Sequence, residues 1–319
     1  MKLVVQVSCL NEAETLPLVL KTIPKKIPGI DSIEVLIIDD GCTDNTVEVA
    51  EKHGVKHFVI HRCNKGLGMG FKDGLNRSLE LGADIIVHTD GDNQYPQECI
   101  PDLIKPVLDG RADMVIADRQ VQSIEHFSKG KKLMQAIGTR ILNAAAGTKI
   151  PDAPSGFRAY SRDAAMQLNV VTKFSYAMET LIQAGNKRMA IATIKIKTNP
   201  KTRESRLFKS SWEHVYKSGI AIARAFIMYR PYVIFNTFAM VMFLAGLVPF
   251  LRYVIFFMVD KHPGAHIQSL IAGSVFLIAA FISFSLSIIS DLTRINRSLA
   301  EDTLEQIKRQ RFDNLQTKD

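Results

Sequence analysis

Residues 83–94 of the chain are Ala-Asp-Ile-Ile-Val-His-Thr-Asp-Gly-Asp-Asn-Gln, a short apolar run that leads directly into two carboxylates, Asp90 and Asp92. The apolar run predicts a buried strand. Carboxylates one residue apart at its end repel each other, and a divalent cation removes that penalty. Hard oxygen ligands suit Mg²⁺ or Mn²⁺, which usually complete their shells with water and substrate phosphates. The stretch therefore predicts a metal–diphosphate site, the alternative being an Asp-rich turn without a ligand.

Strand-like and helix-like runs alternate over residues 1 to about 200, with helical patterns at Thr43 to His53 and Gly70 to Leu81. The predicted strands are Lys2 to Ser8, Ile33 to Ile38, His57 to Ile60, Asp84 to Val87 and Asp113 to Ala117. This alternation predicts a mostly parallel sheet covered by helices on both faces. Ligands of such sheets bind outside the carboxyl ends of the strands. We therefore expect one crevice to hold the acidic residues that follow the second, fourth and fifth strands: Asp39, Asp40, Asp90, Asp92 and Asp118.

The bulk composition sets wider limits. A chain of 319 residues holds one sizeable domain with an appendage, or two small domains. The four cysteines form no C-x-x-C pair and the chain opens on a predicted strand instead of a signal peptide, so reduced thiols in a cytosolic domain are expected. The net charge of +8 by itself is compatible with nucleic acid, anionic lipid or an acidic substrate.

The position of the basic residues decides among these partners. Between Lys195 and Arg230 nine basic residues stand against only Glu204 and Glu213, and aromatic residues are interleaved. This composition predicts an interfacial helix on anionic lipid, an ordinary solvated helix being the alternative. No nucleic-acid partner is expected.

Two uncharged runs follow, Val233 to Leu251 and Ile267 to Ser290. Each is long enough to cross a bilayer, which needs about 20 apolar residues. The basic flanks place both ends in the cytoplasm by the positive-inside rule. We therefore predict a multi-pass protein of the inner or plasma membrane with a cytoplasmic catalytic domain. The expected boundaries are 1–200 for that domain, 201–232 for the basic amphipathic segment, about 233–257 and 267–290 for the transmembrane helices, and 291–319 for a cytoplasmic tail.

A second acidic turn, Asp39-Asp40-Gly41, ends the predicted strand at residues 33–38. Thr43 or Asp44 can cap the helix that follows. Capping does not explain two adjacent carboxylates, which suit hydrogen bonds to a nucleobase edge or to ribose hydroxyls. Ser8-Cys9-Leu10-Asn11-Glu12 ends the first strand in the same way.

Four segments in this order resemble the family 2 glycosyltransferases of the GT-A fold: Leu10-Asn11-Glu12, Ile38-Asp39-Asp40-Gly41, Asn64-Lys65-Gly66-Leu67-Gly68 and Asp90-Gly91-Asp92-Asn93-Gln94. The resemblance implies an α/β GT-A domain, Rossmann-like with a mostly parallel sheet. It also implies a nucleotide-sugar donor, a divalent metal (Mg²⁺ or Mn²⁺) and inversion at the anomeric carbon. Cys42 departs from the family, which commonly has serine there. The implied donor-binding residues are Asn11, Glu12, Asp39, Asp40, Lys65 and Asp90, and the implied metal ligands are Asp90, Asp92 and Gln94.

The glycines from Gly66 to Gly70 do not have the spacing of a dinucleotide fingerprint. We predict that they form a tight loop that seats the following helix, and not a phosphate cradle.

Three further segments resemble the polyprenyl-phosphate glycosyltransferases, including dolichol-phosphate mannose synthases and bacterial two-span homologues: Val115-Ile116-Ala117-Asp118-Arg119, Asp152-Ala153-Pro154-Ser155-Gly156-Phe157-Arg158 and Arg203-Glu204-Ser205-Arg206. The planar fork of arginine suits phosphate, although a structural salt bridge is the alternative for each arginine. The resemblance implies that Arg119 acts in catalysis with Asp90 and Asp92. It also implies Arg119, Arg158, Arg203 and Arg206 as ligands of a polyprenyl phosphate acceptor, and we expect Lys129 and Lys131 to join them.

The sequence thus predicts a membrane-anchored inverting glycosyltransferase that uses a UDP- or GDP-sugar. A phosphate acceptor is already an anion, so it needs no strong carboxylate base. Two alternatives stay open: a family 2 transferase that acts on a sugar hydroxyl of a lipid-linked glycan, and a non-catalytic membrane scaffold. The sugar, the nucleobase, the choice of metal and a homo-oligomeric state are also left open.

Overall fold

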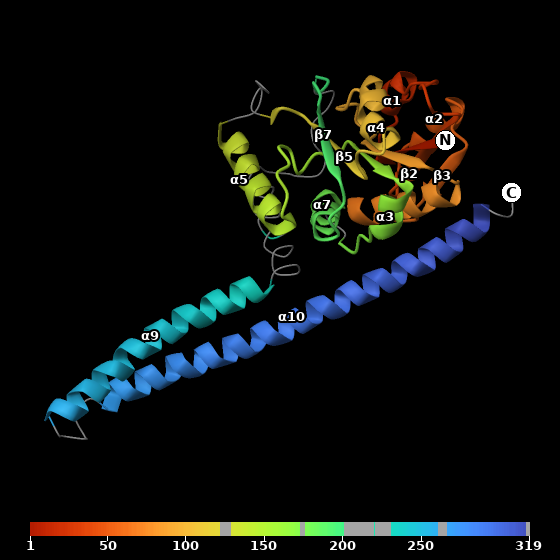
Figure 1. The fold of residues 1–319 in the computed structure, drawn as a ribbon. Coiled ribbons are helices and arrows are strands. Elements are labelled where there is room, and N and C mark those ends of the chain that lie inside the picture. Colours follow the sequence, from red (N-terminus) through yellow and green to blue (C-terminus); the bar gives the residue numbers. More distant parts are fainter. Residues whose placement is uncertain (122–128, 173–175, 201–219, 221–230, 261–266, 317–319) are drawn as a thin grey trace. The chain divides into compact units, whose positions relative to one another are not determined.

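The computed structural model describes residues 1–121, 129–172, 176–200, 220, 231–260 and 267–316. The chain divides into two compact units, one of Met1–Ala225 with Glu301–Asp319 and one of Phe226–Ala300. In Figure 1 the first unit contains a sheet with helices packed on it, and the second consists of two long helices.

Within the described residues, the first unit has a seven-stranded sheet in the order β3-β2-β1-β4-β6-β5-β7. Neighbouring strands are parallel except β6, which is antiparallel to both β4 and β5. The mostly parallel sheet is therefore confirmed. Two short strands, β6 and β7, were not predicted, because β6 has only four residues and begins with a charged one. The strands are β1 (Lys2–Cys9), β2 (Ser32–Asp39), β3 (His57–Ile60), β4 (Ile85–Asp90), β5 (Met114–Asp118), β6 (Arg158–Ser161) and β7 (Ile191–Lys195).

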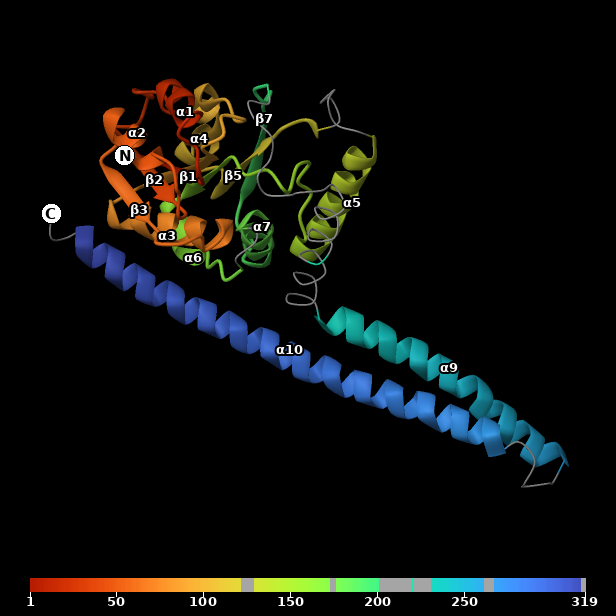
Figure 2. The same cartoon turned by 180° about the vertical axis from the view of Figure 1, so that it is seen from behind.

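Helices cover both faces of this sheet, as predicted; Figures 1 and 2 show α1 and α4 on one side and α3 and α7 on the other. The alternation of side chains along β1 explains the two layers. Leu3, Val5 and Val7 pack into the core with Leu16 of α1 and Leu103 of α4. The helices of this unit are α1 (Leu16–Thr22), α2 (Thr46–Lys52), α3 (Leu67–Glu80), α4 (Ile100–Leu108, after the 3₁₀ turn Gln97–Cys99), α5 (Lys129–Ala146), α6 (Arg162–Gln167) and α7 (Tyr176–Asn186).

The glycine-rich segment positions α3 on the sheet, but its glycines after Gly66 lie within the helix. Only Gly66 stands outside it, with a φ of 94° that favours glycine. The predicted loop is wrong from Leu67 onward, because the later glycines bring the helix close to β2. A Cβ on Gly74 would lie 2.3 Å from Cδ1 of Ile38, and one on Gly70 would lie 3.3 Å from its Cγ2.

The second unit consists of α9 (Pro231–Asp260) and the apolar part of α10 (Ile267–Gln316). By length and composition both helices can cross a membrane, and an apolar stretch of 18 residues in each has a mean hydropathy of 2.1 in α9 and 2.2 in α10. They approach closely at two glycines. A Cβ on Gly246 would lie 3.0 Å from the carbonyl oxygen of Gly273, a spacing typical of helices that associate through small residues in a bilayer.

The tail from Glu301 to Gln316 is helical and continues α10 without a break. Its residues belong to the first unit. Arg311 donates to Glu80 of α3 at 2.6 Å, and Lys308 donates to the carbonyl oxygen of Leu168 at 2.7 Å. Phe312 is buried beside them. The end of the chain is thereby packed against the sheet domain.

Candidate donor and metal site

The turn that follows β4 is held from two sides. Both carboxylate oxygens of Asp92 accept hydrogen bonds from Gln94, Oδ1 from the backbone N–H at 3.1 Å and Oδ2 from the side-chain amide at 2.8 Å. Asn93 has a φ of 59°, a left-handed conformation that asparagine tolerates. Asn199, just after β7, donates to the carbonyl oxygens of Asn93 and Gln94, both at 3.0 Å. Asp90, the last residue of β4, precedes this fixed turn.

Acidic side chains from neighbouring strands lie at the same edge of the sheet. The register aligns the ends of β2 and β4 on either side of β1. Since neighbouring strands are about 4.8 Å apart, Asp39 and Asp90 are separated by about 10 Å. Glu12 is buried at this edge, and its Cγ would lie 3.2 Å from a Cβ on Gly91. The Thr15 hydroxyl lies 2.8 Å from Oε2 of Glu12 and 2.8 Å from the carbonyl oxygen of Gly91, and shares its one proton between them. These residues therefore lie at one edge of the sheet, and the crevice expected to hold them stays a prediction.

Asn11 and Asp39 hold the start of the loop that leads into α2. Oδ1 of Asn11 accepts from the backbone N–H of Thr43 at 2.7 Å, and Oδ1 of Asp39 accepts from that of Cys42 at 2.6 Å. The Cys42 sulfur accepts in turn from the backbone N–H of Asn11 at 3.2 Å. Burial, followed by the contact with Asp39, raises the pKa of Cys42 to about 12. The thiol therefore stays neutral and can serve as the acceptor in the place of the serine hydroxyl.

Asp40 organises a second loop, from His61 to Gly66. Its Oδ1 accepts from the backbone N–H of Lys65 at 2.9 Å, and its Oδ2 accepts from that of Gly66 at 2.9 Å. His61 bridges Oδ1 of Asp40 at 2.8 Å and Oδ2 of Asp73 at 3.0 Å. The ammonium of Lys65 lies 3.4 Å from the same Asp73 oxygen. These contacts favour a role for Asp40 in shaping the wall of the donor site, beside the direct contact that the resemblance implies.

The loop 152–157 forms a third wall and lies directly against Asp90. Gly156 donates its N–H to the Tyr95 hydroxyl and accepts from the Tyr176 hydroxyl, both at 3.0 Å. A Cβ on Gly156 would lie 2.8 Å from the Tyr176 oxygen and 3.4 Å from Oδ2 of Asp90. Burial raises the pKa of Tyr95 to about 12, so its hydroxyl remains protonated. Only a residue without a side chain fits here.

Two predicted acceptor residues also hold this loop. Arg119 pairs with Asp152 through Nε at 2.7 Å and Nη2 at 2.9 Å. Arg158 is fully buried and donates to the carbonyl oxygens of Ser155 and Ala153 and to the Thr180 hydroxyl. In this structure the guanidinium of Arg158 supports the loop through these three internal contacts. Its predicted binding of the acceptor phosphate stays a proposal.

The remaining acceptor residues are beyond what the structure describes. Arg203 and Arg206 lie outside the described residues. Lys129 and Lys131 belong to the first turn of α5, but their side chains are not described. Their predicted role stays a proposal.

The turn at Asp90 and Asp92 fits a divalent cation. Two carboxylates from one turn, with Gln94 beside them, are hard oxygen donors of the kind that Mg²⁺ and Mn²⁺ accept. In the part of the chain that the structure describes, no group of three His, Cys, Asp or Glu side chains could enclose an ion. A cation here would therefore take its remaining ligands from water and from the donor diphosphate.

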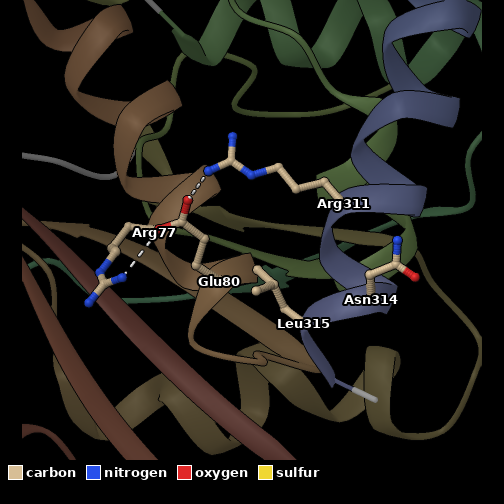
Figure 3. A pocket seen from close by; sticks show the side chains of 5 residues that line it. All are labelled: Arg77, Glu80, Arg311, Asn314 and Leu315. Atoms are coloured by element: carbon tan, nitrogen blue, oxygen red, sulfur yellow. Dashed lines mark hydrogen bonds and ion pairs between the residues drawn. The ribbon is translucent and has the colours of Figure 1, made fainter. Parts of the chain in front are cut away.

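Figure 3 shows a hollow elsewhere, lined by Arg77, Glu80, Arg311, Asn314 and Leu315. Glu80 accepts there from Arg77 at 3.2 Å and from Arg311 at 2.6 Å, so the charges are already paired. The hollow lies at the far end of α3, about 20 Å along the helix from the donor loop at Gly66. It is separate from the candidate donor and metal site.

The model of glycosyl transferase family 2 matches residues 4–168, just over half of the 319 residues. The chain belongs to glycosyl transferase family 2. The match of this family 2 glycosyltransferase includes the turns at Asp39 and Asp90 and the loop 152–157, and it ends well before α9.

Individual relatives of this family 2 glycosyltransferase carry related names. The undecaprenyl-phosphate mannosyltransferase of Micrococcus luteus is 30% identical over 177 residues, which are 53% of this chain and 71% of that protein. The UDP-N-acetylglucosamine–dolichyl-phosphate N-acetylglucosaminyltransferase of Methanococcus voltae is 27% identical over 202 residues, 56% of this chain and 80% of that protein. The dolichol-phosphate mannosyltransferase of Pyrococcus furiosus is 31% identical over 193 residues, 57% of this chain and 53% of that protein.

Solved structures show the same fold. The glucosyl-3-phosphoglycerate synthase of Mycobacterium tuberculosis, in complex with Mn²⁺, UDP and phosphoglyceric acid, superposes with a TM-score of 0.53. The similarity covers 71% of this chain and 77% of that one at 20% identity. The GT-A fold predicted from the four motifs is therefore confirmed.

Sequence reasoning missed residues that act through packing. Tyr95, Tyr176 and Asn199 hold the loops around Asp90, yet nothing in their local sequence indicates it. His88 is different, because a polar residue directly after the apolar run Ile85–Val87, and two residues before Asp90, is itself a signal.

Proposed function

We propose that this family 2 glycosyltransferase transfers a sugar from a UDP- or GDP-sugar to a polyprenyl phosphate at the cytoplasmic face of the inner or plasma membrane. The observation that carries the proposal is the turn at Asp90 and Asp92, at the same sheet edge as Asp39, in a chain with two helices of membrane-spanning length and hydropathy. The names of three relatives, which refer to undecaprenyl, dolichyl or dolichol phosphate, support the acceptor class.

In the proposed reaction a phosphate oxygen of the acceptor attacks the anomeric carbon. The bond from that carbon to the donor diphosphate breaks, and its electron pair leaves with the nucleoside diphosphate, which inverts the configuration. The acceptor oxygen is already ionised, so no side chain has to remove a proton. A divalent cation held by Asp90, Asp92 and Gln94 would supply positive charge to the departing diphosphate.

The protein side chains would do the binding and orienting. Asn11, Glu12, Asp39, Asp40 and Lys65 would form the donor wall, either by direct contact or through the loops that they hold. Arg119 would add positive charge beside Asp90, reduced by its pairing with Asp152. Lys129, Lys131, Arg203 and Arg206 would bind the acceptor phosphate, and the last two would do so at headgroup depth, where the lipid tail can stay in the bilayer.

The decisive experiment is a screen of nucleotide-sugars against a polyprenyl phosphate, with the full chain in detergent or lipid and mass detection of the product. The expected product is a lipid monophosphate sugar. A disaccharide formed only on a lipid-linked glycan would replace the proposal by the hydroxyl-acceptor alternative. Absence of any metal-dependent transfer or donor hydrolysis would favour the non-catalytic scaffold.

A further inference from the structure

His88 is a buried polar residue that the proposed reaction does not use. It lies in β4, two residues before Asp90, and is fully buried. The rings of Phe71 and Tyr176 meet the imidazole edge-on, at centroid distances of 5.1 and 4.6 Å. A polar group in such a place is costly unless it has a partner, so its contacts require an explanation.

One ring nitrogen has a partner that determines the tautomer. The side-chain nitrogen of Gln6 lies 3.0 Å from Nδ1 of His88, and the Gln6 oxygen accepts from the Ser78 hydroxyl at 3.5 Å. An amide nitrogen can only donate, so Nδ1 accepts. A ring nitrogen that accepts a hydrogen bond carries no proton. The single ring proton is therefore on Nε2.

The other nitrogen points to the metal-binding turn. Nε2 of His88 is buried and has no hydrogen-bond partner among the described residues. It lies 3.9 Å from Oδ1 of Asp90, about 0.7 Å beyond the upper end of an N–H···O hydrogen bond. A small rotation of the carboxylate would close that gap.

We propose that His88 is a positioning residue for Asp90: its Nε2–H holds one carboxylate oxygen and thereby orients the carboxylate for the cation. This inference rests on the metal assignment of the proposed function and goes beyond it. Hydrogen bonds from outside a metal's ligand set commonly contribute about 10–100-fold to metal affinity, because they fix the ligand's direction. The Gln6–Ser78 contacts serve the same end, since they keep the proton on the nitrogen that faces Asp90.

Two substitutions separate this role from simple packing. In His88→Gln the amide nitrogen reaches the position of Nε2, so the donor is retained and the Nδ1 acceptor is lost. In His88→Asn the amide reaches only the position of Nδ1, so the donor toward Asp90 is lost. Mn²⁺ affinity is measured by electron paramagnetic resonance on the full chain in detergent, with UDP or GDP, whichever tightens Mn²⁺ binding to the natural chain. Unfolding temperature, kcat and KM are recorded in parallel.

We expect His88→Asn to weaken Mn²⁺ binding about tenfold and His88→Gln to stay within about threefold of the natural chain. Should the Asn variant not fold, His88→Met removes both nitrogens at similar volume and takes its place. Equal weakening in the donor-retaining and donor-lacking variants, or none in either, overturns the proposal, as does a natural chain that binds no Mn²⁺ with nucleotide. The Mn²⁺ titrations contain no acceptor, so an error in the acceptor assignment would not change them. That error is detected separately by the product screen.

Discussion

The guanidinium of Arg119 meets the carboxylate of Asp152 at two points, Nε with Oδ2 at 2.7 Å and Nη2 with Oδ1 at 2.9 Å. The backbone N–H of Arg119 adds a third bond to Oδ2 at 3.1 Å, and Gln135 of α5 donates to Oδ1 at 3.3 Å. The pair joins the end of β5 to the loop that lies against Asp90. Its geometry makes Arg119 a support of the site whether or not it also touches phosphate.

Replacing Arg119 by lysine should therefore impair transfer although the charge is kept, because an ammonium cannot make the two-point contact. A charge-assisted hydrogen bond is worth about 1.5–3 kcal/mol, so we expect kcat/KM to fall about tenfold or more. Steady-state kinetics with a lipid phosphate acceptor measure this change in kcat/KM. Arg111→Lys, at an exposed pair with Asp109, is the matched control and should change little. Full activity of Arg119→Lys would show that the two-point contact is dispensable.

Asp90→Asn and Asp92→Asn should each abolish transfer while the chain stays folded. Either change removes one negative charge from the turn that would hold the cation, and the diphosphate charge is then left uncompensated. Product formation and unfolding temperature are the two measurements, with Asp109→Asn as a surface control. A chelator should reversibly abolish transfer by the natural chain. Full activity in chelator would refute the metal assignment.

Cys42 should react slowly with thiol reagents at pH 8, because the thiolate is the reactive form and burial raises its pKa from 9.0 to about 12. The exposed Cys63 should be labelled first. Raising the pH toward 12 should speed the labelling of Cys42 as its thiolate forms. Peptide mapping by mass spectrometry after timed alkylation gives both rates. Labelling of Cys42 as fast as that of Cys63 at pH 8 would contradict this expectation.

Both ends of the chain should be cytoplasmic, with only the segment between α9 and α10 outside. The prediction comes from the basic flanks of the two apolar helices. A Lys261→Cys variant should react with an impermeant thiol reagent on intact cells. The native Cys63 is the internal control and should react only after lysis. Labelling of Cys63 from outside would reverse the topology.

Arg206→Ala should raise the acceptor concentration needed for half-maximal rate about tenfold or more, because one charge-assisted contact to phosphate is lost. Binding of the nucleotide-sugar should remain nearly unchanged. Separate titrations of donor and acceptor make the distinction. Weaker donor binding with normal acceptor use would assign Arg206, which lies outside the described residues, to the donor site.

Local sequence patterns determined the fold class, the acidic edge of the sheet and the two apolar helices of this protein. The alternation of strands and helices and the acidic turns at Asp39 and Asp90 can be recognised from neighbouring residues. Parallel strands end at a common edge of the sheet, which brings these turns to the same side. Hydropathy over about 20 residues is enough to recognise a span. The short antiparallel β6 escaped prediction because four residues carry too little periodic signal.

The tertiary structure alone decided the long-range contacts of the charged side chains. The sequence offers Arg158 as a phosphate ligand, yet the packing of α7 and the 152–157 loop surrounds it with internal acceptors. The pairing of Arg311 with Glu80 joins residues 231 positions apart, and the approach of His88 to Asp90 depends on where Gln6 of another strand lies. Such contacts follow from how distant segments pack, and a polar side chain's partner is therefore not encoded in its neighbours along the chain.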